Sequence, residues 1–136
     1  IAGCGQSCKG CHSPEFQYSD NGAYLTKELF IEIISKYKEK VSCICFMNGY
    51  QYNEIIDLLT ISNNMGFKTC MYAGADSIFQ IKNEVVGLLD YIKIGSYKED
   101  LGGLDNPTTN QKMYKVNKSN NYYMLEDITH KFWRQQ

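Results

Sequence analysis

Short apolar runs alternate along this chain with longer segments in which apolar residues recur every three or four positions. The short runs are typical of buried parallel strands, and the longer segments have the spacing of amphipathic helices. The expected strands are 41–47, 67–73 and 91–94. The expected helices are 26–37, 53–64 and 78–89. This regular alternation of strand and helix predicts an α/β fold with a parallel sheet.

Capping residues stand where these helices are expected to begin. Thr26 precedes the first helix, Asn53 precedes the second, and Asp76 or Ser77 precedes the third. Their side-chain oxygens are expected to accept hydrogen bonds from the free backbone N–H groups of the first turn. Gly66 is expected to end the second helix, because glycine adopts a left-handed conformation easily.

The pattern changes after residue 97. Residues 98–112 contain two adjacent glycines, one proline and many polar residues, which predicts a long loop with a function of its own. The apolar runs 113–116 and 122–125 predict a C-terminal hairpin. We therefore expect a single domain over residues 1–136, in which 98–136 form a C-terminal loop and hairpin.

The number of strand–helix units decides how the sheet is arranged. There are too few units to close an eight-stranded barrel, so the sequence favours an open, partial (β/α) barrel. In such sheets, ligands bind beyond the carboxyl ends of the strands. Four segments are expected at that edge, namely the cysteine-rich loop 4–11, Asn48-Gly49, Tyr72 to Gly74, and Lys93 to Gly95.

Composition and charge argue against several functions. The net charge is −1 and no cluster of lysine or arginine stands out, which argues against a nucleic acid partner. No run is long enough to span a membrane and no secretory segment is evident, so we expect a cytoplasmic protein without a membrane partner. The 6 cysteines are therefore interpreted as reduced thiols and metal ligands rather than as disulfides.

Three of these cysteines, Cys4, Cys8 and Cys11, follow the spacing C-x3-C-x2-C near the start of the sequence. A [4Fe–4S] site held only by cysteines needs four ligands, so three thiolates leave one iron open to a small molecule. The glycines of the same loop permit the unusual backbone dihedrals that wrapping a bulky cluster requires.

Other interpretations of the cysteines stay open. The three thiolates could bind zinc with His12 as the fourth ligand, or they could be ordinary thiols in a loop. Cys43 and Cys45 form a further pair that points to one face of a strand. This pair could bind a metal, but packing as small apolar side chains is favoured.

Two stretches are similar to a known family. The run from Gly3 to Phe16 resembles the radical S-adenosylmethionine (SAM) enzymes, and within them the small activating proteins of anaerobic ribonucleotide reductase. The segments Gly95 to Tyr97, Leu101 to Asp105 and Pro107 to Gln111 resemble the C-terminal part of the same activases.

The resemblance implies a cofactor and a reaction. Cys4, Cys8 and Cys11 would bind a [4Fe–4S] cluster, whose fourth iron would chelate the amino and carboxylate groups of SAM. Reductive cleavage of SAM would give methionine and a 5′-deoxyadenosyl radical, which abstracts hydrogen from a glycine of the partner enzyme. The implied partners are the large catalytic subunit of an anaerobic ribonucleotide reductase and an electron donor such as flavodoxin.

The family has a strand before its cysteine loop. The resemblance therefore implies that this chain is truncated at the N-terminus and lacks the first strand. Residues 1–3 are then expected to be the end of a buried strand that leads into the loop.

The resemblance also implies how the cofactor is held. Asn48-Gly49-Tyr50 stands where the family carries a Gly-Gly-Glu turn that holds the amino group of SAM. Gly49 keeps the tight turn, and the acid is missing. The side-chain carbonyl of Asn48 could accept one hydrogen bond in its place. The alternative is a turn from strand to helix that binds no ligand.

Further residues are expected near the cofactor by their position. Tyr72, Gly74 and Lys93 fall at the same edge of the sheet. His12 is expected either beside the cluster or adenine, or in solvent. The loop 98–111 is the expected contact with the partner.

Two alternative functions stay open. One is an activase of a different glycyl radical enzyme, similar to pyruvate formate-lyase activase, because Leu89-Asp90 and Lys93 resemble a motif there. The segment Gly102 to Asp105 weighs against it. The other is a non-catalytic module that binds zinc or an iron–sulfur cluster.

Overall fold

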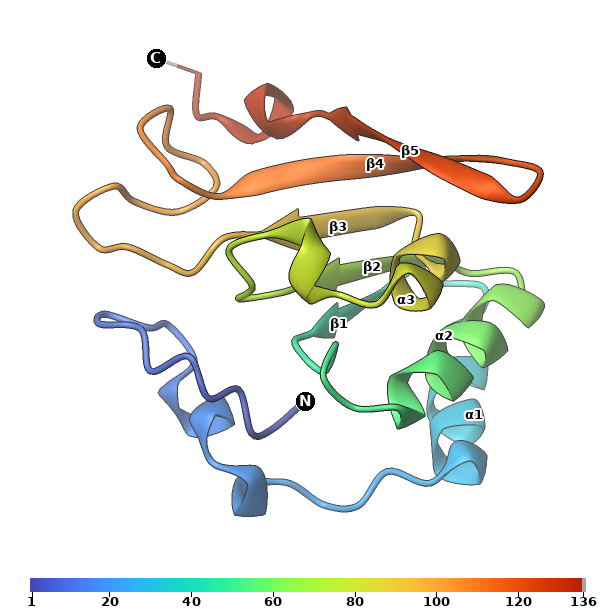
Figure 1. Cartoon of the computed structure of the whole chain (residues 1–136). Helices are drawn as coiled ribbons and strands as arrows, with labels where there is room; N and C mark the ends of the chain where they lie inside the picture. Colours follow the sequence, from blue (N-terminus) through green and yellow to red (C-terminus); the bar gives the residue numbers. More distant parts are fainter. Residues whose placement is uncertain (136) are drawn as a thin grey trace.

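The computed structural model describes residues 1–135 and contains one five-stranded sheet with helices packed against it (Figure 1). In chain order the α-helices and strands are α1 (Lys27–Ser35), β1 (Cys43–Met47), α2 (Glu54–Asn64), β2 (Lys68–Tyr72), α3 (Asn83–Leu88), β3 (Tyr91–Ile94), β4 (Lys112–Ser119) and β5 (Tyr122–Asp127). Short 3₁₀ turns lie at Pro14–Gln17, Ser19–Asn21, Ile78–Gln80 and Thr129–Phe132.

The strands lie side by side in the order in which they occur in the chain. β1, β2 and β3 are parallel, whereas β4 is antiparallel to β3 and β5 is antiparallel to β4. The predicted α/β fold and open sheet are thus confirmed, and the parallel arrangement holds for the first three strands. The predicted C-terminal hairpin is also present, and it extends the same sheet, which is therefore mixed.

One face of the sheet carries the main core. Phe46, Met71 and Ile92 stand next to one another on β1, β2 and β3 and are buried under the helices. Leu59 of α2 and Val86 of α3 pack into the same cluster and are 0% exposed. Burial of apolar area of this kind is the main favourable contribution to folding. The opposite face has no α-helix packed on it in Figure 1.

The segment predicted as one helix over 78–89 is two elements. The hydroxyl of Ser77 accepts a hydrogen bond from the N–H of Phe79, and the Oε1 of Gln80 accepts one from the N–H of Ser77, which closes a single 3₁₀ turn. Ile81 is then extended and 3% exposed, so its side chain reaches the core before α3 begins at Asn83. The gain from burying Ile81 explains why the helix does not continue.

Two cap predictions have opposite outcomes. Thr26 caps α1, since its Oγ1 accepts a hydrogen bond from the N–H of Leu29 at 3.1 Å. Asn53 makes no such bond at the start of α2, because its Oδ1 accepts instead from the ammonium of Lys82. An ammonium is a stronger donor than a backbone N–H, which accounts for the preference.

Residues 1–3 do not form the strand end that the sequence predicts. The N-terminal amine of Ile1 donates one hydrogen bond to the carbonyl of Met47, with 2.9 Å between nitrogen and oxygen. Gly3 has a φ of 82°, which turns the chain out of an extended conformation. The segment therefore touches the end of β1 without pairing along it.

Among residues 1–135, no helix combines the length and the apolar character needed to cross a lipid bilayer.

Candidate functional site

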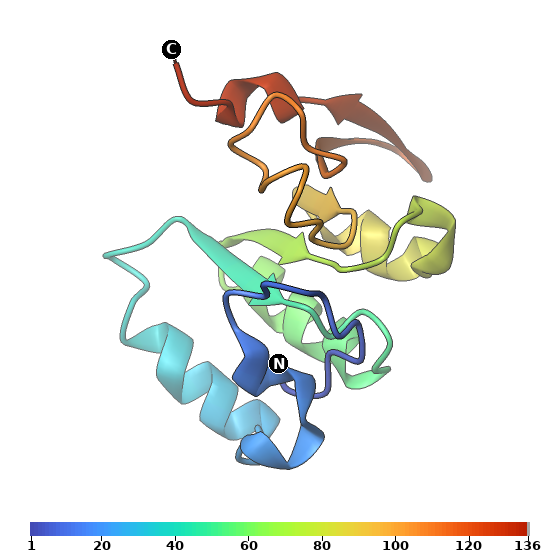
Figure 2. The same ribbon diagram turned by 90° about the vertical axis from the view of Figure 1, so that its left-hand side faces the viewer.

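A cavity of about 490 Å³ lies at the carboxyl ends of β1, β2 and β3. Residues of the N-terminal loop and of the segment that follows β3 both line it. Both segments lie beyond this end of the sheet (Figures 1 and 2). The lining includes Cys4, Gln6, Cys8, Cys11, His12, Met47, Asn48, Tyr72, Gly74, Lys93, Gly95, Tyr97, Leu104, Asp105 and Gln111. Most of the site residues predicted from sequence thus meet in one hollow.

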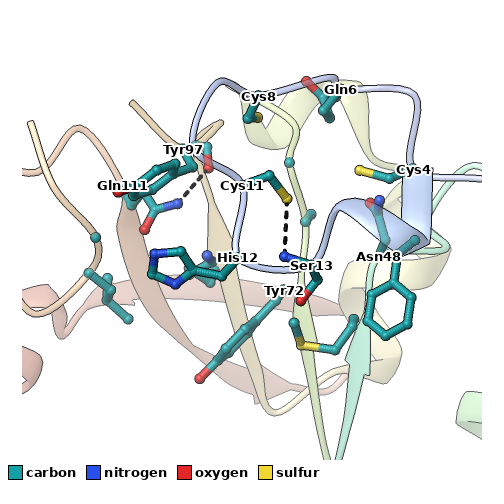
Figure 3. A pocket seen from close by; sticks show the side chains of 18 of the residues that line it. Cys4, Gln6, Cys8, Cys11, His12, Ser13, Asn48, Tyr72, Tyr97 and Gln111 are labelled. Carbon is teal, nitrogen blue, oxygen red and sulfur yellow. Dashed lines mark hydrogen bonds between the residues drawn. The ribbon is translucent and has the colours of Figure 1, made fainter. Parts of the chain in front are cut away.

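The three loop cysteines owe their arrangement to repeated left-handed backbone positions. Gly3, Gly5, Ser7 and Gly10 have φ values of 82°, 70°, 51° and 72°. Such residues coil the chain tightly, and glycine adopts them without steric cost. As a result Cys4, Cys8 and Cys11 all line the cavity and are half-buried (Figure 3).

Hydrogen bonds hold the loop in this form. The N–H of Cys4 donates to the carbonyl of Phe16 at 2.9 Å, and the N–H of Cys11 donates to the carbonyl of Cys8 at 3.3 Å. The Sγ of Cys11 accepts from the N–H of Ser13 at 3.4 Å. This bond fixes the position of the Cys11 sulfur relative to the turn that follows it.

Two contacts join the cysteine loop to the segment after β3. The ring centroids of His12 and Tyr97 are 5.4 Å apart. The ammonium of Lys9 lies 3.5 Å from the carboxylate of Glu99, in an exposed ion pair. Because exposed pairs contribute only about 0–1 kcal/mol, the aromatic contact is the more useful restraint. His12 is thus a wall of the cavity with an exposed side chain.

Asn48 supplies an unpaired hydrogen-bond acceptor. Its φ is 66°, which asparagine tolerates better than most residues, and its N–H donates to the carbonyl of Tyr72 at 2.8 Å. The side chain is 8% exposed and lines the cavity, yet its Oδ1 has no hydrogen-bond partner. A buried unpaired acceptor costs about 1–3 kcal/mol, so a donor from a ligand would be strongly favoured there.

Gly49 and Gly74 have different roles. Gly49 is not among the residues that line the cavity, and its predicted contact with the cofactor stays a prediction. It has a φ of 99°, and a Cβ on it would lie 2.6 Å from the Cδ1 of Ile1, so a side chain would be both strained and crowded at this turn. A Cβ on Gly74 would lie 2.6 Å from the Cγ of Gln6. Gly74 therefore lets the cysteine loop approach the end of β2.

Lys93 brings a cation to the cavity. Its Nζ lies 4.9 Å from the centroid of the Tyr72 ring, within the range of a cation–π interaction. Burial lowers the pKa of the Lys93 ammonium, and the nearby thiols of Cys45, Cys70 and Cys8 oppose this effect. Burial also raises the pKa of the Tyr72 hydroxyl. Lys93 is thus a poorly solvated cation that would gain from an anionic ligand.

Several lining residues were not predicted as site residues, and Gln6, Tyr97 and Gln111 are the polar side chains among them that bear most on the site. Gln111 is 3% exposed, and its side-chain N–H donates to the carbonyl of Gly95 at 3.2 Å. Tyr97 and Gln111 belong to the segments that carry the family resemblance, so the sequence contained a hint. Nothing in the local pattern indicated that these segments face the cysteine loop.

The loops after β2 and β3 are tied together beside the cavity. The Oδ1 of Asp76 accepts from the N–H of Ser96 at 2.9 Å and from its hydroxyl at 2.8 Å. Both bonds lower the pKa of the Asp76 carboxyl, and the bond from the backbone N–H of Ser96 has the larger effect.

This pair predicts a pH-dependent contribution to stability. Because the folded pKa of Asp76 lies below its unfolded value of about 3.9, its stabilising effect is present above pH ~4 and is lost as the pH falls further. Asp76→Asn should therefore lower the free energy of unfolding at pH 7 and leave it unchanged at pH ~2. Urea denaturation at both pH values measures this. If Asp76→Asn lowers the free energy of unfolding by the same amount at both pH values, the charge of Asp76 is not what stabilises the loops.

The cysteine loop brings three thiols to one cavity, where Cys4, Cys8 and Cys11 are half-buried. Within residues 1–135, no group of three or more Cys, His, Asp or Glu side chains converges closely enough to hold one metal ion. A zinc site made by the three cysteines and His12 would require such convergence. Cysteine thiolates are also the usual ligands of iron–sulfur clusters, so the residue types of the loop are compatible with a cluster.

Comparison of the chain with protein-family models, with curated proteins and with solved structures finds no match. The chemistry of the site is therefore inferred from its own residues and from the local resemblance of the cysteine loop.

Proposed function

We propose that this chain is an iron–sulfur enzyme of the radical SAM type that cleaves SAM reductively and generates a glycyl radical on an anaerobic ribonucleotide reductase. One observation carries the proposal. The three cysteines of the C-x3-C-x2-C loop line the same cavity as the unpaired acceptor of Asn48 and the cation of Lys93. A cluster with one open iron requires thiols to hold it. An amino acid ligand on that iron requires an acceptor for its ammonium and a cation for its carboxylate.

The cysteine loop would hold the cluster. Cys4, Cys8 and Cys11 would each give a thiolate to one iron, and the left-handed positions between them keep the loop wrapped. When bound, the cluster supplies a low-potential electron and an open iron for the amino acid end of SAM. The chain itself contributes position and exclusion of water.

Asn48 and Lys93 would hold the two ends of the amino acid group. The Oδ1 of Asn48 would accept a hydrogen bond from the ammonium of SAM, which pairs an otherwise orphaned atom. The ammonium of Lys93 would pair with the carboxylate, which compensates for its burial. The rings of His12 and Tyr97 form a wall on which a purine could stack.

The fold supports the same proposal. An open sheet with three parallel strands and a ligand cavity at their carboxyl ends is what a partial (β/α) barrel of the radical SAM kind requires. The antiparallel β4 and β5 extend the sheet on its far side.

The proposed partners follow from the reaction. The glycine that receives the radical would belong to the large catalytic subunit of the reductase, and an electron donor such as flavodoxin would reduce the cluster. The loop 98–111 is the proposed contact with the large subunit, since it borders the cavity at Gly103, Leu104 and Asp105. As part of this proposal we place the protein in the cytoplasm.

Anaerobic reconstitution with iron and sulfide tests the proposal. The reduced protein should show an EPR signal of a [4Fe–4S] cluster, and SAM should change that signal. A colourless protein that retains zinc, or a cluster whose signal ignores SAM, would exclude the proposed function.

Lys93→Met gives a second test. Loss of a charge-assisted hydrogen bond of about 1.5–3 kcal/mol should weaken SAM binding by roughly 10- to 150-fold. The free energy of unfolding should stay equal or rise, because a half-buried ammonium is replaced by an apolar side chain of similar length. Calorimetric titration of the reconstituted protein with SAM measures the first effect, and urea denaturation measures the second.

Lys115→Met is the matched control, since Lys115 is exposed on β4, next to Tyr91 of β3. This variant should bind SAM as the unchanged chain does. Equal SAM affinity in Lys93→Met and Lys115→Met would remove Lys93 from the binding site.

A further inference from the structure

A second group of cysteines lies outside the proposed cofactor site. Cys43 and Cys45 of β1 and Cys70 of β2 point to the face of the sheet that is opposite the helix-covered core, and none of them lines the cavity. Cys45 and Cys70 are partners in the parallel register. Cys43 is instead the partner of Lys68. Only one pair of thiols on this face is therefore directly aligned.

The spacing of this pair suits a covalent bond. Adjacent strands lie about 4.7–4.9 Å apart, which is inside the range of about 4.4–6.8 Å between the Cα atoms of disulfide-bonded cysteines. A hydrogen bond from the Cys70 thiol lowers the pKa of Cys45, and the cation of Lys93 also favours the Cys45 thiolate, while burial opposes both. The same hydrogen bond, followed by burial, raises the pKa of Cys70.

The two thiols also differ in access to solvent. Cys45 is exposed, whereas Cys70 is only 5% exposed. An exposed thiolate beside a cation is the usual attacking sulfur in thiol–disulfide exchange, and a covered thiol next to it can resolve the mixed disulfide. Cys43 is less suited, because burial raises the pKa of its thiol. Its Sγ–H also donates to the carbonyl of Ile44 at 3.8 Å.

We propose that Cys45 and Cys70 form a redox-active dithiol that closes to a disulfide between β1 and β2 by exchange with a disulfide of low molecular weight. The Cys45 thiolate attacks one sulfur of that disulfide, its S–S bond breaks, and one thiolate leaves. Cys70 then loses its proton to solvent and attacks the sulfur of Cys45, which releases the second thiolate. The two protein thiols lose two electrons in total, and the small disulfide is reduced to two thiols.

The dithiol is close to the cavity. Met47 and Tyr72 follow Cys45 and Cys70 by two residues on the same face of their strands, and both line the cavity. Lys93 acts electrostatically on both thiols and also lines the cavity. Closing the disulfide would therefore change the surroundings of a residue that the proposed function uses. The dithiol itself requires neither a cluster nor SAM.

Oxidised glutathione is the probe for the test. The unchanged chain and a Cys4→Ala/Cys8→Ala/Cys11→Ala variant are incubated with it anaerobically, alkylated with iodoacetamide and digested with trypsin without reduction. Cys43 and Cys45 fall in peptide 41–68, and Cys70 falls in peptide 69–82. Mass spectrometry should find these two peptides linked, with two hydrogens lost, and dithiothreitol should separate them.

Single variants identify the sulfur atoms. The link should be lost in Cys45→Ser and in Cys70→Ser and kept in Cys43→Ser, with urea denaturation used to verify that each variant is folded. A stable glutathione adduct on Cys45 without a link, or a link that persists in Cys45→Ser, would overturn the proposal. Because the loop cysteines are absent from one of the two chains, the result does not depend on the proposed cluster.

Discussion

Replacing Cys8 with alanine is expected to abolish the effect of SAM on the EPR spectrum of the reconstituted protein and to lower its iron content. Cys8 is the middle thiol of the loop and faces the cavity together with Cys4 and Cys11. Without it only two thiolates remain, and three are the fewest that can hold a cubane with one open iron. Iron analysis and EPR of the reduced protein, with and without SAM, measure the two effects.

Cys43→Ala is the matched control for this experiment. Cys43 is also a half-buried free thiol, but it lies on β1 outside the cavity. This variant should bind as much iron as the unchanged chain and should respond to SAM. If Cys8→Ala keeps its iron and its response while Cys43→Ala loses them, the cluster is held by the sheet cysteines and the loop has another role.

Replacing Gly95 with alanine is expected to destabilise the fold more than other substitutions of a turn glycine. Gly95 has a φ of 101°, and a Cβ there would lie 2.9 Å from the Cα of Gln111 and 3.2 Å from the carbonyl oxygen of Asn110. These contacts are with backbone, which cannot rotate away. Backbone strain costs about 1–3 kcal/mol and overpacking about 1–3 kcal/mol, so the loss is roughly 2–6 kcal/mol.

Gly66→Ala separates these two causes. Gly66 has a φ of 86°, but a Cβ on it would meet nothing within 4 Å. Gly66→Ala should therefore lose stability only through backbone strain, so its loss should be about 1–3 kcal/mol. Urea denaturation of both variants with an unchanged m-value measures the difference. If Gly95→Ala is no less stable than Gly66→Ala, the contact between the end of β3 and Gln111 is looser than described.

The regular elements could be predicted because their patterns are local. The strand that contains Cys45, the helix capped by Thr26 and the C-terminal hairpin follow from the spacing of apolar residues and from turn residues a few positions away. The prediction of a single helix over 78–89 was wrong because the deciding interaction is not local. Burial of Ile81 in the core interrupts it, and that gain depends on residues far away in the sequence.

The location of the candidate residues was predictable, although their roles stay predictions. The cysteine loop, Asn48, Tyr72, Gly74 and Lys93 were expected at one edge of the sheet because parallel strands place their carboxyl ends there, and these residues line one cavity together with His12. Gly49 was expected there as well, but its turn packs against Ile1. Tyr97 and Gln111 were missed, because the partner of a long loop cannot be inferred from its own residues.

The sequence by itself determined the spacing of the three loop cysteines, the strand–helix order and the position of Asn48, Tyr72 and Lys93 at the carboxyl ends of strands. Only the tertiary structure decided that the segment after β3 faces the cysteine loop, that the Oδ1 of Asn48 is buried without a partner, and that Cys45 lies beside Cys70. The physical reason is the distance along the chain over which each interaction acts. Backbone periodicity and turn chemistry act between neighbours in the chain, whereas burial, register and the pairing of polar groups depend on which distant segments pack together.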